Sequence, residues 1–208
     1  MADPVYLEAW PFSEGLAPVR SASNGRWGYV GRSIPPLFGG RSFQEAGAFS
    51  DGLALVSDGG EKYYIDVQGQ DAFEGVFADA RDFSEGLVAV LSGDRWGYID
   101  CKGQMVIPPG FESAGSCSEG LLAVRMKGRW GFIDRKGNWA VKNVHEEVWP
   151  FSEGLAAVRK GKKLRFSHFL DYFVYELLML AALFLHVWKV SGAGCAPHLL
   201  NSTDADSP

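Results

Sequence analysis

The stretch Arg95-Trp96-Gly97-Tyr98-Ile99-Asp100, followed at once by Cys101-Lys102-Gly103, decides the fold of this chain because it recurs. A close copy, Arg129-Trp130-Gly131-Phe132-Ile133-Asp134 with Arg135-Lys136-Gly137 behind it, stands 34 residues further on. More divergent copies stand at Lys62–Gly69 and at Trp27-Gly28-Tyr29. A motif that returns at a fixed step is the sequence signature of a tandem repeat.

A second motif keeps the same step and sets the register of the units. It is a Phe-Ser-Glu-Gly-Leu turn, with small variations, and it starts at Phe12, Phe49, Phe83, Cys117 and Phe151. Its glycines are Gly15, Gly52, Gly86, Gly120 and Gly154. Together the two motifs define four units of about 34 residues and the start of a fifth, within residues 1–160. The first unit is irregular, as terminal repeats commonly are.

Each unit is predicted to hold three short antiparallel strands. The first is a continuous apolar run such as Leu87–Val90, which is typical of a strand covered on both faces. The second is the Trp-Gly stretch. The third is Gln104–Ile107, which is expected to stop before Pro108-Pro109 because proline cannot donate a hydrogen bond to a neighbouring strand.

The Trp-Gly motif and its turn are predicted to be structural. Alternation along a strand places Trp96 and Tyr98 on one face, where they would share a core with the neighbouring unit. The aspartate that ends the strand is expected to bond the backbone that follows it, and the glycine after it to take a positive φ. The motif residues are Trp27, Gly28, Trp96, Gly97, Asp100, Gly103, Trp130, Gly131, Asp134 and Gly137.

The pattern Trp-Gly-Phe/Tyr-Ile-Asp-x-x-Gly, combined with Val-Ile-Pro-Pro and with Phe-Ser-Glu-Gly-Leu, resembles the WG-repeat family, also called KWG repeats. The resemblance covers roughly Tyr6 to Arg159. It implies an all-β repeat structure and an interaction platform, and it supplies no catalytic residues. The second unit departs from the pattern, with Lys62-Tyr63 in place of Trp-Gly.

The predicted fold class is an all-β tandem repeat array with an appended C-terminal α-helix. We expect the array to be open and solenoid-like. A three-stranded unit of this length is short for a blade of a closed propeller, which has four strands in about 40–45 residues.

After Gly161 the repeat pattern is lost, and Leu164-Arg165 stand where Trp-Gly is due. Residues 161–190 are predicted to be a basic cluster followed by an apolar helix, and 191–208 a disordered tail. A helix over Phe169–Val190 would reach roughly 33 Å, enough to cross a bilayer, with the basic cluster holding the array on the cytoplasmic side. Two alternatives stay open: an amphipathic helix that covers the open end of the array, and a foreign tail from a retained intron or shifted frame.

Composition narrows the function classes. The formal net charge of -5 argues against a nucleic-acid partner. Three cysteines without paired spacing, and no secretory signal, indicate a cytoplasmic protein with reduced thiols. No cofactor, metal site or nucleophile is predicted. The recurring acids are interpreted as solvent-facing turn residues and not as a ligand row: Glu14, Asp51, Glu85, Glu119 and Glu153.

The predicted function is a non-enzymatic scaffold for a protein partner, tethered to a membrane by Phe169–Val190. The alternative is a module that binds a glycan or peptide with exposed Trp and Tyr side chains. Burial of the Trp side chains between units would favour the scaffold, and a contiguous exposed row of them would favour the ligand-binding module.

Overall fold

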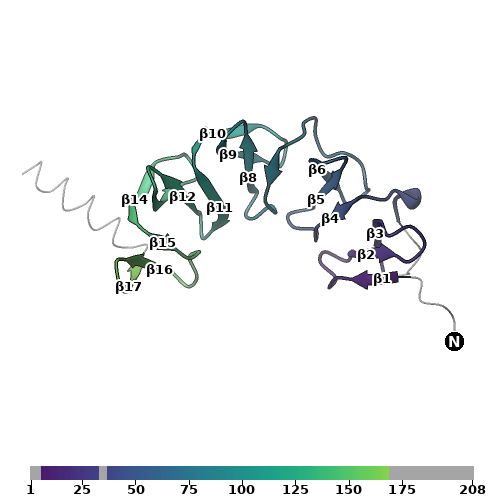
Figure 1. Ribbon diagram of the computed structural model, residues 1–208, viewed down its shortest axis with the longest axis horizontal. Helices are drawn as coiled ribbons and strands as arrows, with labels where there is room; N and C mark the ends of the chain where they lie inside the picture. Colours follow the sequence, from purple (N-terminus) through teal and green to yellow (C-terminus); the bar gives the residue numbers. More distant parts are fainter. Residues whose placement is uncertain (1–5, 33–36, 169–208) are drawn as a thin grey trace, which may run out of the picture. The chain divides into compact units, whose positions relative to one another are not determined.

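The computed structural model describes residues 6–32 and 37–168, and within these the protein is all-β (Figure 1). In these described ranges, seventeen strands form five separate antiparallel sheets, and each sheet belongs to one sequence repeat. The one helical element of the described part is a short 3-10 turn, η1 (Phe38–Gly40). The predicted all-β repeat architecture is therefore confirmed.

The units are numbered 1 to 5 along the chain. Unit 1 contains β1 (Tyr6–Ala9), β2 (Ala17–Ser21) and β3 (Trp27–Val30). Unit 2 contains β4 (Glu45–Ala46), β5 (Leu53–Asp58) and β6 (Glu61–Asp66). Unit 3 contains β7 (Asp79–Ala80), β8 (Leu87–Ser92), β9 (Arg95–Asp100) and β10 (Met105–Phe111). Unit 4 contains β11 (Ser113–Ser118), β12 (Leu121–Met126), β13 (Arg129–Asp134) and β14 (Trp139–His145). Unit 5 contains β15 (Glu147–Val148), β16 (Leu155–Lys160) and β17 (Lys163–His168).

The strand content of a unit differs from the prediction in two ways. First, a strand that precedes the Phe-Ser-Glu-Gly turn joins every sheet, and the sequence analysis did not assign it. Second, the predicted strand after the Trp-Gly hairpin is a regular strand only in units 3 and 4, among the described residues. In unit 3 it does not stop at Pro108 but continues to Phe111. Both prolines are tolerated because β10 is an edge strand, and its pairing with β9 is irregular there.

The glycine of the Trp-Gly motif permits the fourth strand in these two units, although it does not by itself produce one, since unit 1 has Gly28 and a three-stranded sheet. A Cβ atom on Gly97 would lie 2.7 Å from the backbone oxygen of Ile107 in β10, and one on Gly131 would lie 2.5 Å from that of Val141 in β14. Only glycine allows the crossing strand to approach so closely. Units 2 and 5 carry Tyr63 and Arg165 at this position, and their sheets have three strands.

The hydrophobic core lies between successive sheets. Trp96 and Tyr98 pack on one side with Cys117 and Leu122 of unit 4, whereas Ile99 of the same strand packs on the other side with Tyr64 of unit 2. The sheet of unit 3 is thus covered on both faces, which confirms the predicted alternation. It also explains why the apolar strand β8 is buried throughout Leu87–Val90. The same arrangement recurs between units 1 and 2 and between units 4 and 5.

The fifth unit extends further than expected. The sequence analysis placed the end of the array at residue 160, but Lys163–His168 forms β17 and pairs with β16 over its whole length. The register places Phe166 opposite Ala157, as Phe132 stands opposite Ala123 in unit 4. The strand therefore forms without the Trp-Gly pair, since hairpin pairing with β16 is enough.

The predicted helix at Phe169–Val190 and the predicted tail at 191–208 lie outside the described residues. Among the residues that the structure describes, no helix has the length and apolar character needed to cross a membrane.

Candidate binding cleft and the turn ladder

The tryptophans of the Trp-Gly motif are part of the core. Trp27 and Trp96 are buried, and Trp130 is half-buried. Burial between units was the outcome expected for a scaffold, and a contiguous exposed Trp row is not found among the described residues. Two other tryptophans, Trp10 and Trp149, are nearly half exposed and occupy the same repeat position, two residues before the phenylalanine of the turn.

The aspartate turns are formed as predicted. The Asp100 Oδ1 atom accepts hydrogen bonds from the backbone N–H groups of Lys102 and Gln104, each at 2.9 Å. The Asp134 Oδ1 atom accepts the equivalent two at 2.8 Å. The glycines that follow, Gly103 and Gly137, have φ values of 76° and 88°. These aspartates hold turns, and no group of three or more acidic, histidine or cysteine side chains that could bind a metal occurs in the described part of the chain.

The Phe-Ser-Glu-Gly turns also join each unit to the next by hydrogen bonds, which the sequence did not indicate. In the first four turns, each serine hydroxyl donates to the backbone carbonyl of the residue that opens the next turn, at 2.5 to 2.8 Å: Ser13 to Phe49, Ser50 to Phe83, Ser84 to Cys117 and Ser118 to Phe151. Each acid accepts the N–H of the glycine in the next turn, at 2.7 to 3.0 Å: Glu14 from Gly52, Asp51 from Gly86, Glu85 from Gly120 and Glu119 from Gly154. We call this set of bonds the turn ladder.

The recurring acids are exposed turn residues, as predicted, and the turn ladder adds a role that the sequence analysis did not assign. Four of them connect one unit to the next, and only the fifth, Glu153, has no following turn within the described residues. The signal was present in the sequence as the regular return of Ser and an acid, 37 residues apart at the first step and 34 at the later ones. Their partners could not be read from it, because the bonds join residues that are 33 to 38 positions apart.

Glu85 is the most connected acid of the turn ladder. Its carboxylate accepts the N–H of Gly120, the Cys117 thiol (Sγ to Oε2, 3.3 Å) and the N–H of Glu119. These bonds, led by that from Gly120, lower its pKa. Burial, with Glu85 beside it, raises the pKa of the Cys117 thiol to about 12, so this cysteine, which replaces the phenylalanine of the other turns, is unreactive.

The lowered pKa of Glu85 predicts a pH-dependent stability. A carboxyl whose pKa is lower in the folded than in the unfolded chain stabilises the fold above the unfolded value, and this stability is lost as the pH falls through the folded value. We expect Glu85→Gln to remove about 1 kcal/mol or less at neutral pH, because the group is exposed. Urea midpoints should then depend less on pH than in the wild type, as the pH falls from neutral through the ordinary range of a glutamate pKa and below it. Glu74→Gln, at an exposed acid outside the turn ladder, is the control and should change neither. An unchanged pH dependence in Glu85→Gln would contradict the assignment.

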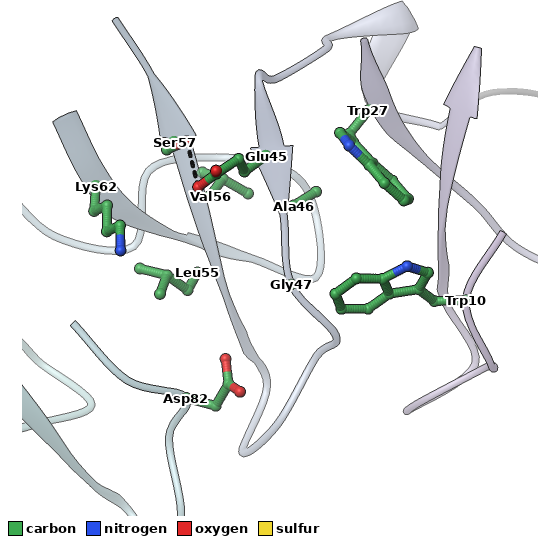
Figure 2. Close-up of a pocket in the computed structure, with 10 residues that line it drawn as sticks. All are labelled: Trp10, Trp27, Glu45, Ala46, Gly47, Leu55, Val56, Ser57, Lys62 and Asp82. Carbon is green, nitrogen blue, oxygen red and sulfur yellow. Dashed lines mark hydrogen bonds between the residues drawn. The ribbon is translucent and has the colours of Figure 1, made fainter. Parts of the chain in front are cut away.

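A cleft of about 350 Å³ opens at unit 2, where the repeat pattern is broken (Figure 2). In unit 1 the indole of Trp10 packs edge-on against that of Trp27, with ring centroids 5.6 Å apart. In unit 3 the same two repeat positions hold Arg81 and Trp96. The Arg81 guanidinium lies over the indole of Trp96, 5.3 Å from the ring centroid. In unit 2 these positions hold Gly47 and Lys62, so no stack forms there and a cleft is left.

The walls of the cleft combine indole rings with charged groups. In Figure 2, Trp10 and Trp27 line one side, and Leu55 and Lys62 lie across from them. Gly47 forms part of the wall next to Asp82, since a Cβ atom on this glycine would lie 3.4 Å from the Asp82 Oδ1 atom. Trp10 is 48% exposed and presents an accessible aromatic surface to a ligand.

The cleft has an excess of negative charge. The Lys62 ammonium is bound by Asp79, with 2.6 Å between Nζ and Oδ1, so its charge is already matched. The carboxylates of Glu45 and Asp82 form no ion pair within the described part of the chain; Glu45 accepts only the Ser57 hydroxyl, at 3.2 Å. Partial desolvation raises the pKa of Asp82, against the opposing effect of Arg81. A cation brought by a ligand would complement these groups.

Five sheets that share aromatic cores and are joined turn to turn define a tandem β-repeat protein, a class that is typical of interaction and binding modules. Within this class the chain belongs to the family of WG containing repeats, which it matches at residues 1–27, 64–96, 96–130 and 130–163. Residues 28–63, which hold the Lys62-Tyr63 departure and most of the cleft, fall outside the match. Among curated proteins, no relative matches this sequence.

Several solved structures are similar to this chain at low identity. Kluyveromyces lactis Hsv2 is 12% identical with a TM-score of 0.46, over 76% of this chain and 59% of that one. YCF48 bound to D1 peptide is 13% identical with a TM-score of 0.43, over 76% and 62%. A protein of unknown function from Bacteroides caccae is 14% identical with a TM-score of 0.36, over 72% and 68%. The chain therefore spans about three fifths of the length of the first two.

Proposed function

We propose that this protein is a non-enzymatic scaffold and that the cleft of unit 2 binds a basic side chain of a protein partner. One observation supports this: the place where the repeat loses its aromatic stack combines an exposed indole with two carboxylates outside any described ion pair. An arginine or lysine side chain would contact the Trp10 ring with its charge and place that charge near Asp82 and Glu45. Cation–π contacts of this kind contribute about 0.5–2 kcal/mol.

The array that carries the cleft is proposed to be open. The sheets of the first and last described units are not paired with each other, and both units expose large apolar side chains. The membrane tether at Phe169–Val190 and the cytoplasmic location stay predictions, which fractionation of the full chain beside a truncation after His168 would check.

The cleft proposal predicts which substitutions weaken binding. On an array of short peptides that differ only in a central residue, the wild-type chain should retain peptides with central Arg or Lys over those with Glu. Trp10→Ala and Asp82→Asn should each weaken this binding by about tenfold, since each removes about 1–2 kcal/mol. Trp149→Ala is the matched control, because Trp149 has the same repeat position and a similar exposure without lining the cleft.

The alternative function, glycan or uncharged peptide binding, gives a different result. Trp10 exposure favours it, because a sugar ring or a neutral side chain can also lie against an indole. Binding that is lost in Trp10→Ala but unchanged in Asp82→Asn, with no preference for basic peptides, would support this alternative. Binding that survives Trp10→Ala would rule out the cleft as the site for either ligand.

A further inference from the structure

The contact between successive units is repeated with little change along the chain, so its geometry shows how two free unit faces would fit together. At three of the four boundaries, an aromatic side chain on the Trp-Gly strand of one unit meets, edge-on, the phenylalanine that opens the turn of the next; at the boundary between units 3 and 4, Tyr98 packs with Cys117 instead. Tyr29 meets Phe49 at 5.0 Å between ring centroids, Tyr64 meets Phe83 at 4.9 Å, and Phe132 meets Phe151 at 4.8 Å. The turn ladder runs beside each of these aromatic pairs. Every unit therefore has a leading face and a trailing face that fit each other.

The last unit exposes an unused leading face. Phe166 stands at the repeat position of Tyr64 and Phe132, which are 1% exposed, but is itself 70% exposed. Leu164 beside it is 57% exposed. The Ser152 hydroxyl and the Glu153 carboxylate, which would continue the turn ladder, make no side-chain hydrogen bond within the described residues.

The first unit exposes an unused trailing face. Phe12 is 57% exposed, whereas Phe49, Phe83 and Phe151 at the same repeat position are 1 to 3% exposed. Tyr6 packs against the aliphatic part of this face, which consists of Ala17, Val19 and Val30. The part that no described residue covers is therefore Phe12 and its turn. No described residue binds the N–H of Gly15 as Glu14 binds that of Gly52.

We propose that these two faces bind each other between copies of this chain, so that the protein associates head to tail. Phe12 of one copy would pack on Phe166 of another. Ser152 would donate to the Phe12 carbonyl, and Glu153 would accept the Gly15 N–H, which adds a fifth step to the turn ladder. The contact is continuous with the four internal ones, and each face fits the other and not itself. Head-to-tail association is the expected result of such heterologous faces.

The missing Trp-Gly pair in unit 5 does not prevent this contact. Arg165 would exclude a crossing strand, but Tyr63 stands at the same position in unit 2. Unit 2 nevertheless contacts unit 3 through Tyr64 and Phe83 and through the turn ladder, with three strands in its sheet. A fourth strand is therefore dispensable for the contact between units.

Sedimentation of the full-length chain over a range of concentrations tests the proposal. The wild type should form species larger than a monomer. Phe12→Glu and Phe166→Glu should each weaken association by about 100-fold, because a charge would enter an apolar contact. Val76→Glu, a substitution of another exposed apolar residue, is the control and should associate like the wild type. All three positions are more than half exposed, so folding should be unaffected, and urea midpoints would check this.

Mixing the two variants gives the sharpest result. Each variant alone lacks one of the two faces, but together they retain one intact pair, so the mixture should form a 1:1 dimer and nothing larger. A wild type that stays monomeric would overturn the proposal. So would association that persists in either variant alone, because it would place the contact elsewhere, such as in Phe169–Val190 or between two like faces. Failure of this test leaves the cleft proposal unaffected, since Phe12 and Phe166 do not line the cleft.

Discussion

Replacing Gly131 with alanine should destabilise the protein by about 3 kcal/mol, the cost of forcing extra volume into a closely packed backbone contact. The new Cβ atom would lie 2.5 Å from the Val141 oxygen and 2.7 Å from the Asn143 nitrogen. Both are backbone atoms of β14, so relief requires the strand to move away from β13. Gly97→Ala should behave alike, with its Cβ atom 2.7 Å from the Ile107 oxygen of β10.

The matched control is Gly28→Ala, the same motif position in unit 1. The nearest atom to its Cβ would be the Arg41 oxygen at 3.6 Å, an ordinary contact. Alanine should therefore be neutral there or stabilise by about 0.4–1 kcal/mol, because it restricts the unfolded chain. Urea unfolding of the three variants measures the difference. Equal effects at Gly28, Gly97 and Gly131 would contradict the close approach of the fourth strand.

Replacing Tyr98 with alanine should cost about 3–5 kcal/mol, the range for removing a large buried side chain. Tyr98 is fully buried, and its hydroxyl donates to the Gly115 carbonyl in unit 4 at 2.9 Å. Since a repeat array is stabilised by contacts between neighbours, the loss should fall on the boundary between units 3 and 4. Unfolding in urea should then separate into two transitions, which fluorescence and circular dichroism would follow at different midpoints.

Tyr98→Phe separates packing from hydrogen bonding at the same site. It keeps the ring and removes the hydroxyl, so it should cost about 1–2 kcal/mol and leave a single transition. Phenylalanine is the natural residue at this position in unit 4, as Phe132. If alanine and phenylalanine at position 98 had the same effect, the ring would not be the contact that joins the two units.

Much of the fold could be predicted from patterns of residues that are close together within one repeat unit. The 34-residue step, the apolar run Leu87–Val90 and the alternation through Trp96 and Tyr98 predicted repeated antiparallel hairpins with buried rings, and the structure has them. The Asp100 turn was also predictable, because its bonds join residues two and four positions apart. These features depend on residues close together in the chain, and their chemistry is visible in one unit.

Other features depend on contacts between units, which one unit does not reveal. The strand β10 continues past Pro108 and Pro109 because it lies at the edge of its sheet. The strand β17 forms by pairing with β16, although unit 5 lacks the Trp-Gly motif. The cleft lies where unit 2 has Gly47 and Lys62, 15 positions apart, at the positions that hold an indole pair in unit 1 and an arginine over an indole in unit 3.

The sequence by itself determined that this protein is a chain of equivalent β units, because periodic hydrophobic and turn residues act locally and identically in each unit. Only the tertiary structure decided how the units are joined and where a cleft and two exposed end faces remain. The acids at the turns, Glu14 through Glu119, were ambiguous in sequence because a carboxylate at a turn suits water and a neighbouring backbone N–H equally well. Packing one unit against the next brings that N–H to within 3.0 Å, and at Phe12 and Phe166 the described chain supplies no neighbour.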